Sequence, residues 1–386
     1  MPGLHPHIDP DGLLEYSVVF TDRSLNHMSA RFREVMRTVS ATLKDTYNAD
    51  SVAVVPGGGT FAMEAVARQF GTNKRCIVLR NGWFSYRWTQ IFEAGGIPAE
   101  SVVLRARPVD DGPTPAFAPA PIDEVVSAIA GVRPDVVFAP HVETSAGILL
   151  SGDYLRAVAE ATHAVGGIFV LDAIASGALW VDMEESGVDV LISAPQKGWS
   201  GSPCAGVVMF GPEGRARAAA SRSTSFAADL HMWLRVMDAY LDGRQLYHAT
   251  MPTDSLRFFS EVMLETSDFG LENARARQWE LGNRIRALLA GKGFASVAAP
   301  GFEAPGVVVS HTDDPAIHNG TRFAAAGLQI AAGVPLRCGE PDGFRTFRLG
   351  LFGLDKLGNV DRTVDTFEAA LEQVLAAGAP ASAVGA

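Results

Sequence analysis

Short apolar runs alternate with longer amphipathic segments over the first two thirds of the chain. The runs rich in Val and Ile that predict buried strands are 51–55, 76–80, 135–139, 167–172, 188–193 and 205–210. Helices are predicted between them, at 61–70, 84–94, 122–130 and 154–165. Continuous apolar strands separated by helices are typical of a mainly parallel sheet covered on both faces. We therefore expect an α/β fold as far as about residue 255.

The pattern changes after this point. Amphipathic segments at 254–265 and 272–289 predict two long helices, and strands are predicted at 306–310 and 345–349 before a last helix at 360–375. We expect this part to form a smaller α+β domain. The Pro-rich stretch 110–121 predicts a surface loop. The expected division is an N-terminal arm over 1–25, a large domain over 26–255, a small domain over 256–375 and a flexible tail over 376–386.

Composition and charge limit the classes of partner. The 386 residues are 47% hydrophobic and 19% charged, with a formal net charge of -11. This charge disfavours nucleic acid and anionic membranes, since both require concentrated Lys and Arg. Three cysteines without CxxC spacing predict neither a disulfide framework nor a zinc site, which favours a reducing compartment. No leader-like segment or run of about 20 apolar residues is found, so we expect a cytoplasmic protein without a metal.

A glycine-rich turn follows the first predicted strand and opens the next helix. Its sequence is Pro56-Gly57-Gly58-Gly59-Thr60. Glycines let a backbone approach an oxyanion, and a helix N-terminus offers free N–H groups, so phosphate is the natural ligand. The spacing fits neither a Walker loop nor GxGxxG. A tight connection without a ligand is the alternative interpretation.

Two more candidates follow later strands. Asp172 ends the fourth predicted strand, where open α/β sheets bind ligands, and a buried acid there needs a cationic partner. Lys197 lies just after the fifth, flanked by Pro195, Gly198 and Trp199. Partial desolvation would lower its pKa and make it a nucleophile towards an aldehyde. A helix-capping acid and a solvated loop lysine are the alternatives, but a phosphate cradle, an acid and a lysine at strand ends together favour the functional interpretation.

Further motifs accompany these three in a fixed order. They are NGWFSYR at 81–87, HVETSAG at 141–147, YHATMP at 247–252 and RLGLFG at 348–353. In this order they resemble the class V aminotransferases of pyridoxal 5'-phosphate (PLP) fold type I, in the branch of the alanine/serine-glyoxylate and 2-aminoethylphosphonate-pyruvate aminotransferases. The resemblance covers roughly residues 26–375. It implies PLP as the cofactor and a mainly parallel, seven-stranded sheet in the large domain.

The resemblance also implies a role for each matched residue. Lys197 would form the Schiff base with PLP and move the proton at the substrate Cα, while Asp172 would pair with the pyridine nitrogen. Phe84 would stack on the ring, with Trp83 as a possible substitute. Arg348 would bind the substrate carboxylate or phosphonate through its bidentate fork. The remaining implied cofactor contacts are Gly58, Gly59, Thr60, Thr144, Ser176, Gln196, Tyr247 and Thr250.

Several of these matches carry more detail. The hydroxyl of Thr144 matches the position that hydrogen-bonds the phenolic oxygen of PLP, and Glu143 would support its loop. Ser176 would sit near the ring. Gln196 stands where a cysteine desulfurase would require a histidine. Among the neighbouring side chains, we expect Tyr86 and Trp88 to pack in the core. We expect Arg337 and Arg345 to lie on the surface.

The YHATMP segment resembles one that reaches across a dimer. Tyr247 and Thr250 would contact the phosphate bound by the neighbouring subunit, which implies a homodimer with shared active sites. The alternative is a turn between helices closed by Pro252. No other purpose is evident for this break between predicted helices.

One departure from the family leaves the substrate open. The family usually begins with a GPxP turn near the substrate, whereas this chain reads YSVVFTD at 16–22. The expected reaction is ping-pong transamination from a small alanine-like, serine-like or aminophosphonate donor to pyruvate or glyoxylate. A lyase, racemase or desulfurase on the same scaffold is one alternative, with Cys338 as a candidate thiol. A non-catalytic PLP-binding protein is another.

Overall fold

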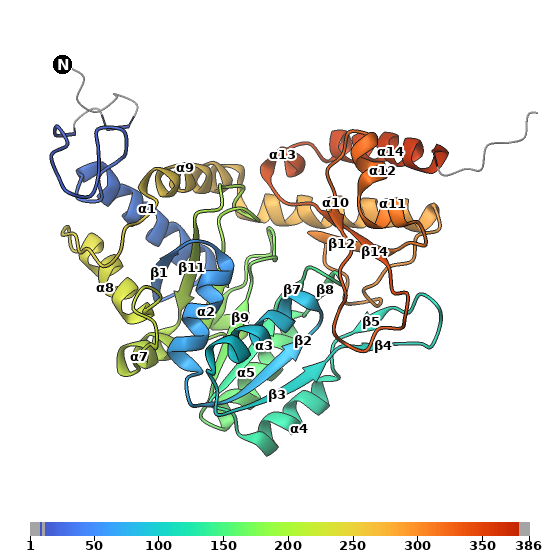
Figure 1. Cartoon of the computed structure of the whole chain (residues 1–386), viewed down its shortest axis with the longest axis horizontal. Coiled ribbons are helices and arrows are strands. Elements are labelled where there is room, and N and C mark those ends of the chain that lie inside the picture. Colours follow the sequence, from blue (N-terminus) through green and yellow to red (C-terminus); the bar gives the residue numbers. More distant parts are fainter. Residues whose placement is uncertain (1–7, 10–11, 378–386) are drawn as a thin grey trace, which may run out of the picture.

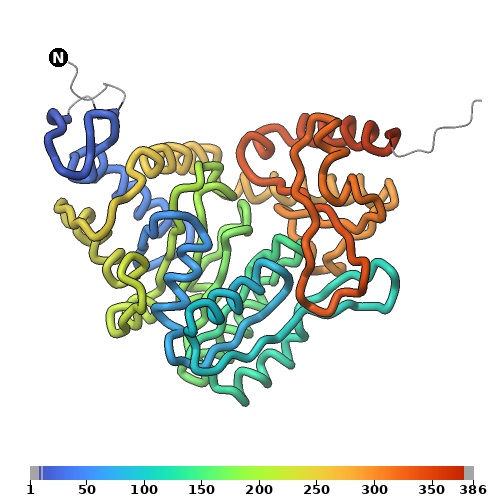
Figure 2. Tube along the Cα trace, viewed as in Figure 1, coloured from blue at the N-terminus to red at the C-terminus, as the bar shows by residue number. Residues whose placement is uncertain are grey.

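The computed structural model describes residues 8–9 and 12–377 (Figure 1). The rest of the predicted N-terminal arm and tail, residues 1–7, 10–11 and 378–386, lies outside this description. A wide sheet with its helices forms one part of the molecule, and the segments from about residue 271 onwards gather beside it (Figure 2). Among the described residues, no helix combines the length and apolar character needed to cross a membrane.

The central sheet has seven strands in the order β1-β11-β10-β9-β6-β2-β3. All are parallel except β11, which runs antiparallel to both of its neighbours. The fold class predicted from the apolar runs is therefore confirmed. The strands are β1 (Ser51–Pro56), β2 (Arg75–Arg80), β3 (Glu100–Arg105), β6 (Val136–Pro140), β9 (Ile168–Asp172), β10 (Val190–Ser193) and β11 (Ala205–Phe210).

Helices cover both faces of this sheet because the chain crosses it in two directions. The connections from β1 through β2 to β3 advance one way, and those from β3 through β6 to β9 return the other way. Right-handed crossovers in opposite directions lie on opposite faces. The helices of these crossovers begin and end close to the predicted positions: α2 (Gly59–Phe70), α3 (Trp83–Gly95), α4 (Ile122–Val132) and α5 (Gly152–Ala164).

Four more helices pack around the sheet before the chain leaves it. The helix α1 buries Phe32, Val39 and Leu43 and lies against α8, α9 and β1. Ser29 caps its first turn by accepting a hydrogen bond from the Phe32 amide at 3.0 Å. These helices are α1 (Ala30–Tyr47), α6 (Met183–Ser186), α7 (Pro212–Ala220) and α8 (Leu230–Leu241).

The C-terminal unit is a three-stranded antiparallel sheet packed with helices. Its strands follow the order β12-β14-β13, where β12 is Val307–His311, β14 is Thr346–Gly350 and β13 is Ala331–Ala332. Two long helices lead into it, as the amphipathic segments predict. Of these two, α9 (Thr253–Phe269) packs against α1 and α10 (Leu271–Gly291) enters the unit, whose other helices are α11 (Pro315–His318), α12 (Thr321–Ala325), α13 (Leu354–Leu357) and α14 (Val360–Ala376).

The Pro-rich stretch 110–121 is not wholly a surface loop. Its end forms β5 (Phe117–Ala118), which pairs with β4 (Arg107–Pro108). Phe117 is fully buried, its ring 6.0 Å from that of Phe344, and its amide bonds to the carbonyl of Val297. A second short hairpin joins β7 (Val142–Glu143) to β8 (Ile148–Leu149). Apolar side chains thus anchor a stretch that its prolines alone would leave exposed.

Candidate active site

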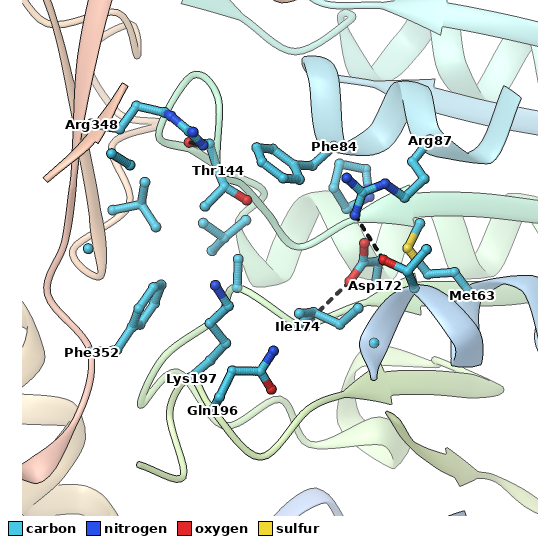
Figure 3. Close-up of a pocket in the computed structure, with 18 of the residues that line it drawn as sticks. Met63, Phe84, Arg87, Thr144, Asp172, Ile174, Gln196, Lys197, Arg348 and Phe352 are labelled. Carbon is cyan, nitrogen blue, oxygen red and sulfur yellow. Dashed lines mark hydrogen bonds between the residues drawn. The ribbon is translucent and has the colours of Figure 1, made fainter. Parts of the chain in front are cut away.

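A cavity of about 360 Å³ lies where the sheet meets the C-terminal unit. The carboxyl ends of β6 and β9, the turn after β10 and the N-terminus of α2 contribute its walls, and β14 closes it from the other side (Figure 3). Eight predicted site residues line this cavity: Gly59, Thr60, Phe84, Thr144, Asp172, Gln196, Lys197 and Arg348.

Lys197 projects into the cavity from a tight turn after β10 (Figure 3). The turn is closed by a hydrogen bond from the Gly201 amide to the carbonyl of Pro195 at 2.8 Å. Gly198 allows the turn to pack, because a Cβ there would lie 2.1 Å from the carbonyl oxygen of Gly177. Burial lowers the pKa of Lys197, the charge of Arg348 lowers it further, and Asp172 opposes both. The amine is therefore closer to its neutral, nucleophilic form.

Asp172 is an acid without a cationic partner of its own. It is 8% exposed, and one carboxylate oxygen accepts a hydrogen bond from the Ile174 amide at 3.0 Å. Burial raises its pKa to about 7, against the opposing effects of that amide, Arg87 and Lys197. Within the described residues it forms no ion pair. A protonated ring nitrogen is the kind of group that this carboxylate would stabilise.

The glycine-rich turn leaves the N-terminus of α2 open. Gly57 has φ +119°, a conformation that favours glycine, and Gly58 is the N-cap. A Cβ on Gly59 would lie 2.5 Å from Cδ1 of Ile174, so a side chain would intrude on the cradle. The first N–H groups of a helix have no intrahelical partner. Together with the Thr60 hydroxyl they can receive a phosphate.

Arg87 is a cavity residue that the sequence interpretation missed. It comes from α3, and its Nη1 donates to the Thr60 hydroxyl at 3.0 Å (Figure 3). Its Cζ lies 5.2 Å from the centre of the Phe84 ring. The sequence could have indicated it, because residues three apart on a helix lie on the same face. If Phe84 faces the cavity, Arg87 on the same helix is expected to face it too. Arg87 adds positive charge beside an otherwise neutral cradle.

The HVETSAG motif positions α3. Glu143 is fully buried and accepts hydrogen bonds from the amides of Phe84 and Ser85 at 3.1 and 2.9 Å, and from the Ser85 hydroxyl at 2.6 Å. Ser145 donates to it through its hydroxyl at 2.7 Å. A carboxylate at a helix N-terminus also interacts favourably with the helix dipole. This network fixes where α3 starts, and thereby where the ring of Phe84 lies.

Phe84, not Trp83, faces the cavity. The Phe84 ring lies between two guanidinium groups, with Cζ of Arg348 at 5.3 Å. Trp83 instead lies 5.6 Å from the ring of Tyr86 and 5.5 Å from Cζ of Arg337. Trp88 packs in the core as expected. The core assignment of Tyr86 is wrong, since its half-buried ring lines a second cavity on the other side of α3.

Ser176 is not among the residues that line the cavity. Its hydroxyl is 2.7 Å from Nδ1 of His141, and both side chains are buried. Burial lowers the pKa of His141 to about 4, so the imidazole is neutral near pH 7. This hydrogen bond directs the Ser176 hydroxyl towards His141, and its place near the ring stays a prediction.

Gln196 and Thr144 bring polar groups to the cavity beside these charges. The Oε1 atom of Gln196 is buried and has no hydrogen-bond partner within the described residues. Since the two ends of an amide exchange by rotation, it can offer a donor or an acceptor to a ligand. The backbone carbonyl of Thr144 contacts Nη1 of Arg348 at 3.5 Å, and its side chain lines the same wall.

Arg348 faces the cavity from the opposite side (Figure 3). Its Nε donates to the carbonyl of Ala332 at 2.8 Å, which directs the guanidinium towards Thr144. The two nearby alternatives do not line this cavity: Arg345 bonds to the carbonyl of Asp313, and Arg337 lies beside Trp83. Phe352, also missed by the sequence interpretation, has its ring centre 5.4 Å from Nζ of Lys197.

Tyr247 and Thr250 lie outside this cavity in the single chain. Their hydroxyls are 2.9 Å apart, and Tyr247 is half exposed. Within one subunit they therefore do not join Gly58, Gly59 and Thr60. Contact with a phosphate would require a second copy of the chain.

A doubly wound sheet with a buried acid, a partly buried lysine and a glycine-rich helix start around one cavity defines a PLP enzyme of fold type I. The orphaned amide of Gln196 and the unpaired Asp172 fit this cofactor, since one can bond to a ligand and the other can pair with a protonated pyridine nitrogen.

Comparisons with known proteins agree with this class. The chain is 30% identical over 368 residues to 2-aminoethylphosphonate–pyruvate transaminase 2 of Paraburkholderia xenovorans strain LB400, covering 92% of this chain and 93% of that one. An alanine–glyoxylate aminotransferase from Nostoc sp. has a TM-score of 0.76 at 21% identity, covering 90% and 88%. An aspartate aminotransferase from Thermus thermophilus has 0.72 at 25%, covering 91% and 94%. No family model matches.

The chain belongs to the class V aminotransferases, the family of the 2-aminoethylphosphonate–pyruvate transaminases. It is a PLP-dependent transaminase, and the resemblance of its motifs to this family is confirmed.

Proposed function

We propose that this transaminase moves an amino group from a small donor with an anionic group to pyruvate or glyoxylate in a ping-pong reaction. The observation that carries the proposal is that Lys197 and Arg348 both project into one cavity from opposite sides. A short donor held by the guanidinium would bring its amine to the lysine. Relatives named for 2-aminoethylphosphonate and pyruvate, or for alanine and glyoxylate, support these substrate classes.

The chain's own residues would divide the chemistry between them. Bound PLP supplies an electron sink for the substrate Cα carbanion. Lys197 would hold the cofactor covalently and, once displaced by the donor, carry the proton at Cα. Asp172 would keep the pyridine nitrogen protonated. Phe84 would stack on the ring, and the Thr144 hydroxyl would donate to its phenolic oxygen.

The phosphate would be held by both neutral and charged groups. We propose that Gly58, Gly59 and Thr60 supply the cradle and that Arg87 and Gln196 add further donors from the same chain. The Arg87 guanidinium already bonds to Thr60, which supports this assignment. Tyr247 and Thr250 would come from the second subunit of a homodimer.

A donor screen tests the function. Each candidate, 2-aminoethylphosphonate, alanine or serine, is added to the holoenzyme without an oxo acid, and the visible absorbance of the bound cofactor is followed. Conversion to the aminated cofactor reports the first half-reaction whatever the acceptor. Adding pyruvate or glyoxylate should then restore the original spectrum. If none of the donors changes the spectrum, the proposed donor class is wrong.

The position of Cys338 argues against the alternative that the protein is a desulfurase. Its sulfur does not line the cavity, lies 3.4 Å from the carbonyl of Arg80, and has its pKa raised to about 12, chiefly by burial. A buried thiol of this kind is a poor nucleophile. We also propose a cytoplasmic location, supported by three unpaired cysteines, and a division into a large and a small domain near residue 255.

A further inference from the structure

A second cavity, of about 610 Å³, lies on the other side of α3 from the active site. Three arginines line it from different parts of the fold. Arg80 ends β2, Arg105 ends β3, and Arg337 lies in the segment between β13 and β14. Neither Arg80 nor Arg105 lines the active-site cavity.

The first two arginines are held side by side by the sheet. Arg80 and Arg105 are register partners on parallel strands, so their side chains leave the sheet on the same face. Like charges at paired positions are destabilising unless something neutralises them. The carboxyl ends of parallel strands are also where α/β sheets bind ligands. The pairing therefore places two repelling cations at a position suited to a ligand.

Two carboxylates, Glu93 and Glu340, share the cavity wall with the three cations, and neither forms an ion pair with them within the described residues. None of the three arginines forms an ion pair there. The carboxylate of Glu340, on the cavity wall, accepts hydrogen bonds from the amides of Leu336, Arg337 and Cys338 at 2.7 to 3.0 Å. Arg80 is only 5% exposed, and its Nε is buried without a hydrogen-bond partner.

The remaining contacts of Arg80 and Arg337 fix the positions of these two side chains. Nη2 of Arg80 donates to the Thr89 hydroxyl at 2.7 Å, and Nη1 reaches the carbonyl of Arg337 at 3.4 Å. Its Cζ lies 4.6 Å from the centre of the Tyr86 ring, and Cζ of Arg337 lies 5.8 Å from the same ring. Arg337 itself has φ +62°, a conformation uncommon for a residue with a side chain. Guanidinium groups ordered in this way are preorganised donors.

We propose that this cavity binds a small oxyanion, of the phosphate or phosphonate type, between Arg80, Arg105 and Arg337. Planar guanidinium forks match such oxygens in bidentate geometry, and the three cations outnumber the two carboxylates, Glu93 and Glu340, on the cavity wall. Because Arg337 belongs to the C-terminal unit and the other two to the sheet, a bound anion ties the two parts together beside the active site.

Calorimetric titration of the PLP-loaded enzyme with inorganic phosphate, at constant ionic strength made up with chloride, tests the proposal. The exposed arginines are changed, since Arg80 is part of the core. We expect Arg105→Gln and Arg337→Gln each to weaken phosphate binding by about tenfold or more, as loss of a charge-assisted pair would. The matched control is Arg222→Gln, an exposed arginine after α7 that should leave binding unchanged.

The active site is the competing location for phosphate. Arg348→Gln should leave the titration unchanged if the anion binds at the second cavity. Loss of binding in Arg348→Gln, with Arg105→Gln and Arg337→Gln unaffected, would overturn the proposal. So would the absence of phosphate binding by the wild-type enzyme, or equal weakening in Arg222→Gln, which would indicate a general charge effect.

Discussion

Two ionisable side chains at the cavity, the buried Asp172 and the partly buried Lys197, have their pKa values shifted towards each other. Burial raises the pKa of Asp172 to about 7 and lowers that of Lys197. Both shifts disfavour the charged forms in the bare protein. Bound PLP would lower the pKa of Asp172 again, because its cationic ring nitrogen would pair with the carboxylate. The lowered pKa of Lys197 favours its reaction with the cofactor, since a neutral amine attacks an aldehyde.

Lys197 is expected to be the only lysine covalently linked to PLP. Borohydride reduction of the holoenzyme followed by peptide mapping should find the label on the peptide that contains Lys197. Lys197→Ala should bind PLP without a covalent link, whereas the exposed control Lys74→Ala should keep the label at 197. Label on another lysine would end the assignment.

We expect Asp172 to make the cofactor-free enzyme less stable at neutral and higher pH. Its folded pKa of about 7 lies above the ordinary aspartate value of 3.8, so between these values the folded state binds more protons than the unfolded state. Stability is then lost as pH rises from about 4 to 7, by about 1.4 kcal/mol for each unit of pKa shift. Asp172→Asn should remove this loss. Thermal melts of both apoproteins between pH 5 and 8 should diverge at the alkaline end; parallel curves would contradict it.

Arg348 should set the affinity for both substrates. Arg348→Lys keeps the charge but loses the planar fork, so KM for donor and oxo acid should rise roughly tenfold or more while PLP binding is unchanged. Arg345→Lys is the matched control, because Arg345 bonds to the carbonyl of Asp313 outside the cavity. Steady-state kinetics with both substrates measure the difference. Equal effects of the two changes would remove the special role of Arg348.

The elements around the site depend on a few buried polar contacts that a pattern of apolar positions does not reveal. Glu143 holds the start of α3 through both carboxylate oxygens. In Glu143→Gln, the amide nitrogen would face groups that are themselves donors. We expect the free energy of unfolding to fall by about 1–3 kcal/mol. PLP affinity should also weaken, because Phe84 and Arg87 lie in the first turns of α3 and move with its N-terminus.

Thermal unfolding and PLP titration of Glu143→Gln measure both effects. The exposed Glu160→Gln, on α5, serves as the control and should change neither. A variant with normal stability and normal PLP affinity would show that α3 is held by its other contacts.

At the same scale, the apolar pattern predicted the strands of the large sheet that are buried on both faces and missed its exposed edge strand. The strands β1, β2, β6, β9, β10 and β11 read as continuous apolar runs because helices cover both faces. The edge strand β3 has exposed, charged ends, and β13 has two exposed alanines, so neither gives such a run. Motifs located Lys197 and Arg348, whereas Arg87 and Phe352 needed the packing of α3 and β14 to place them.

At the scale of the whole molecule, one chain leaves the proposed phosphate site incomplete. A bound phosphate carries nearly two negative charges, and the cradle of Gly58, Gly59 and Thr60 supplies mostly neutral donors. Arg87 adds one cation, while Tyr247 and Thr250 stand outside the cavity with Tyr247 half exposed. If they complete the site of a neighbouring subunit, each subunit contributes to two active sites.

Mixing two inactive variants distinguishes shared sites from separate ones. Lys197→Ala lacks its own lysine but presents intact Tyr247 and Thr250, whereas the double variant Tyr247→Phe, Thr250→Ala keeps the lysine but damages its partner's phosphate site. If sites are shared, a heterodimer contains one site with every group and one with both defects, so mixing after dissociation should restore up to half the wild-type activity per dimer. If each site is built from one chain, both sites of the heterodimer stay defective and mixing restores nothing. That result, or an active enzyme that sediments as a monomer, would refute the shared site, and mixing Lys197→Ala with itself provides the background.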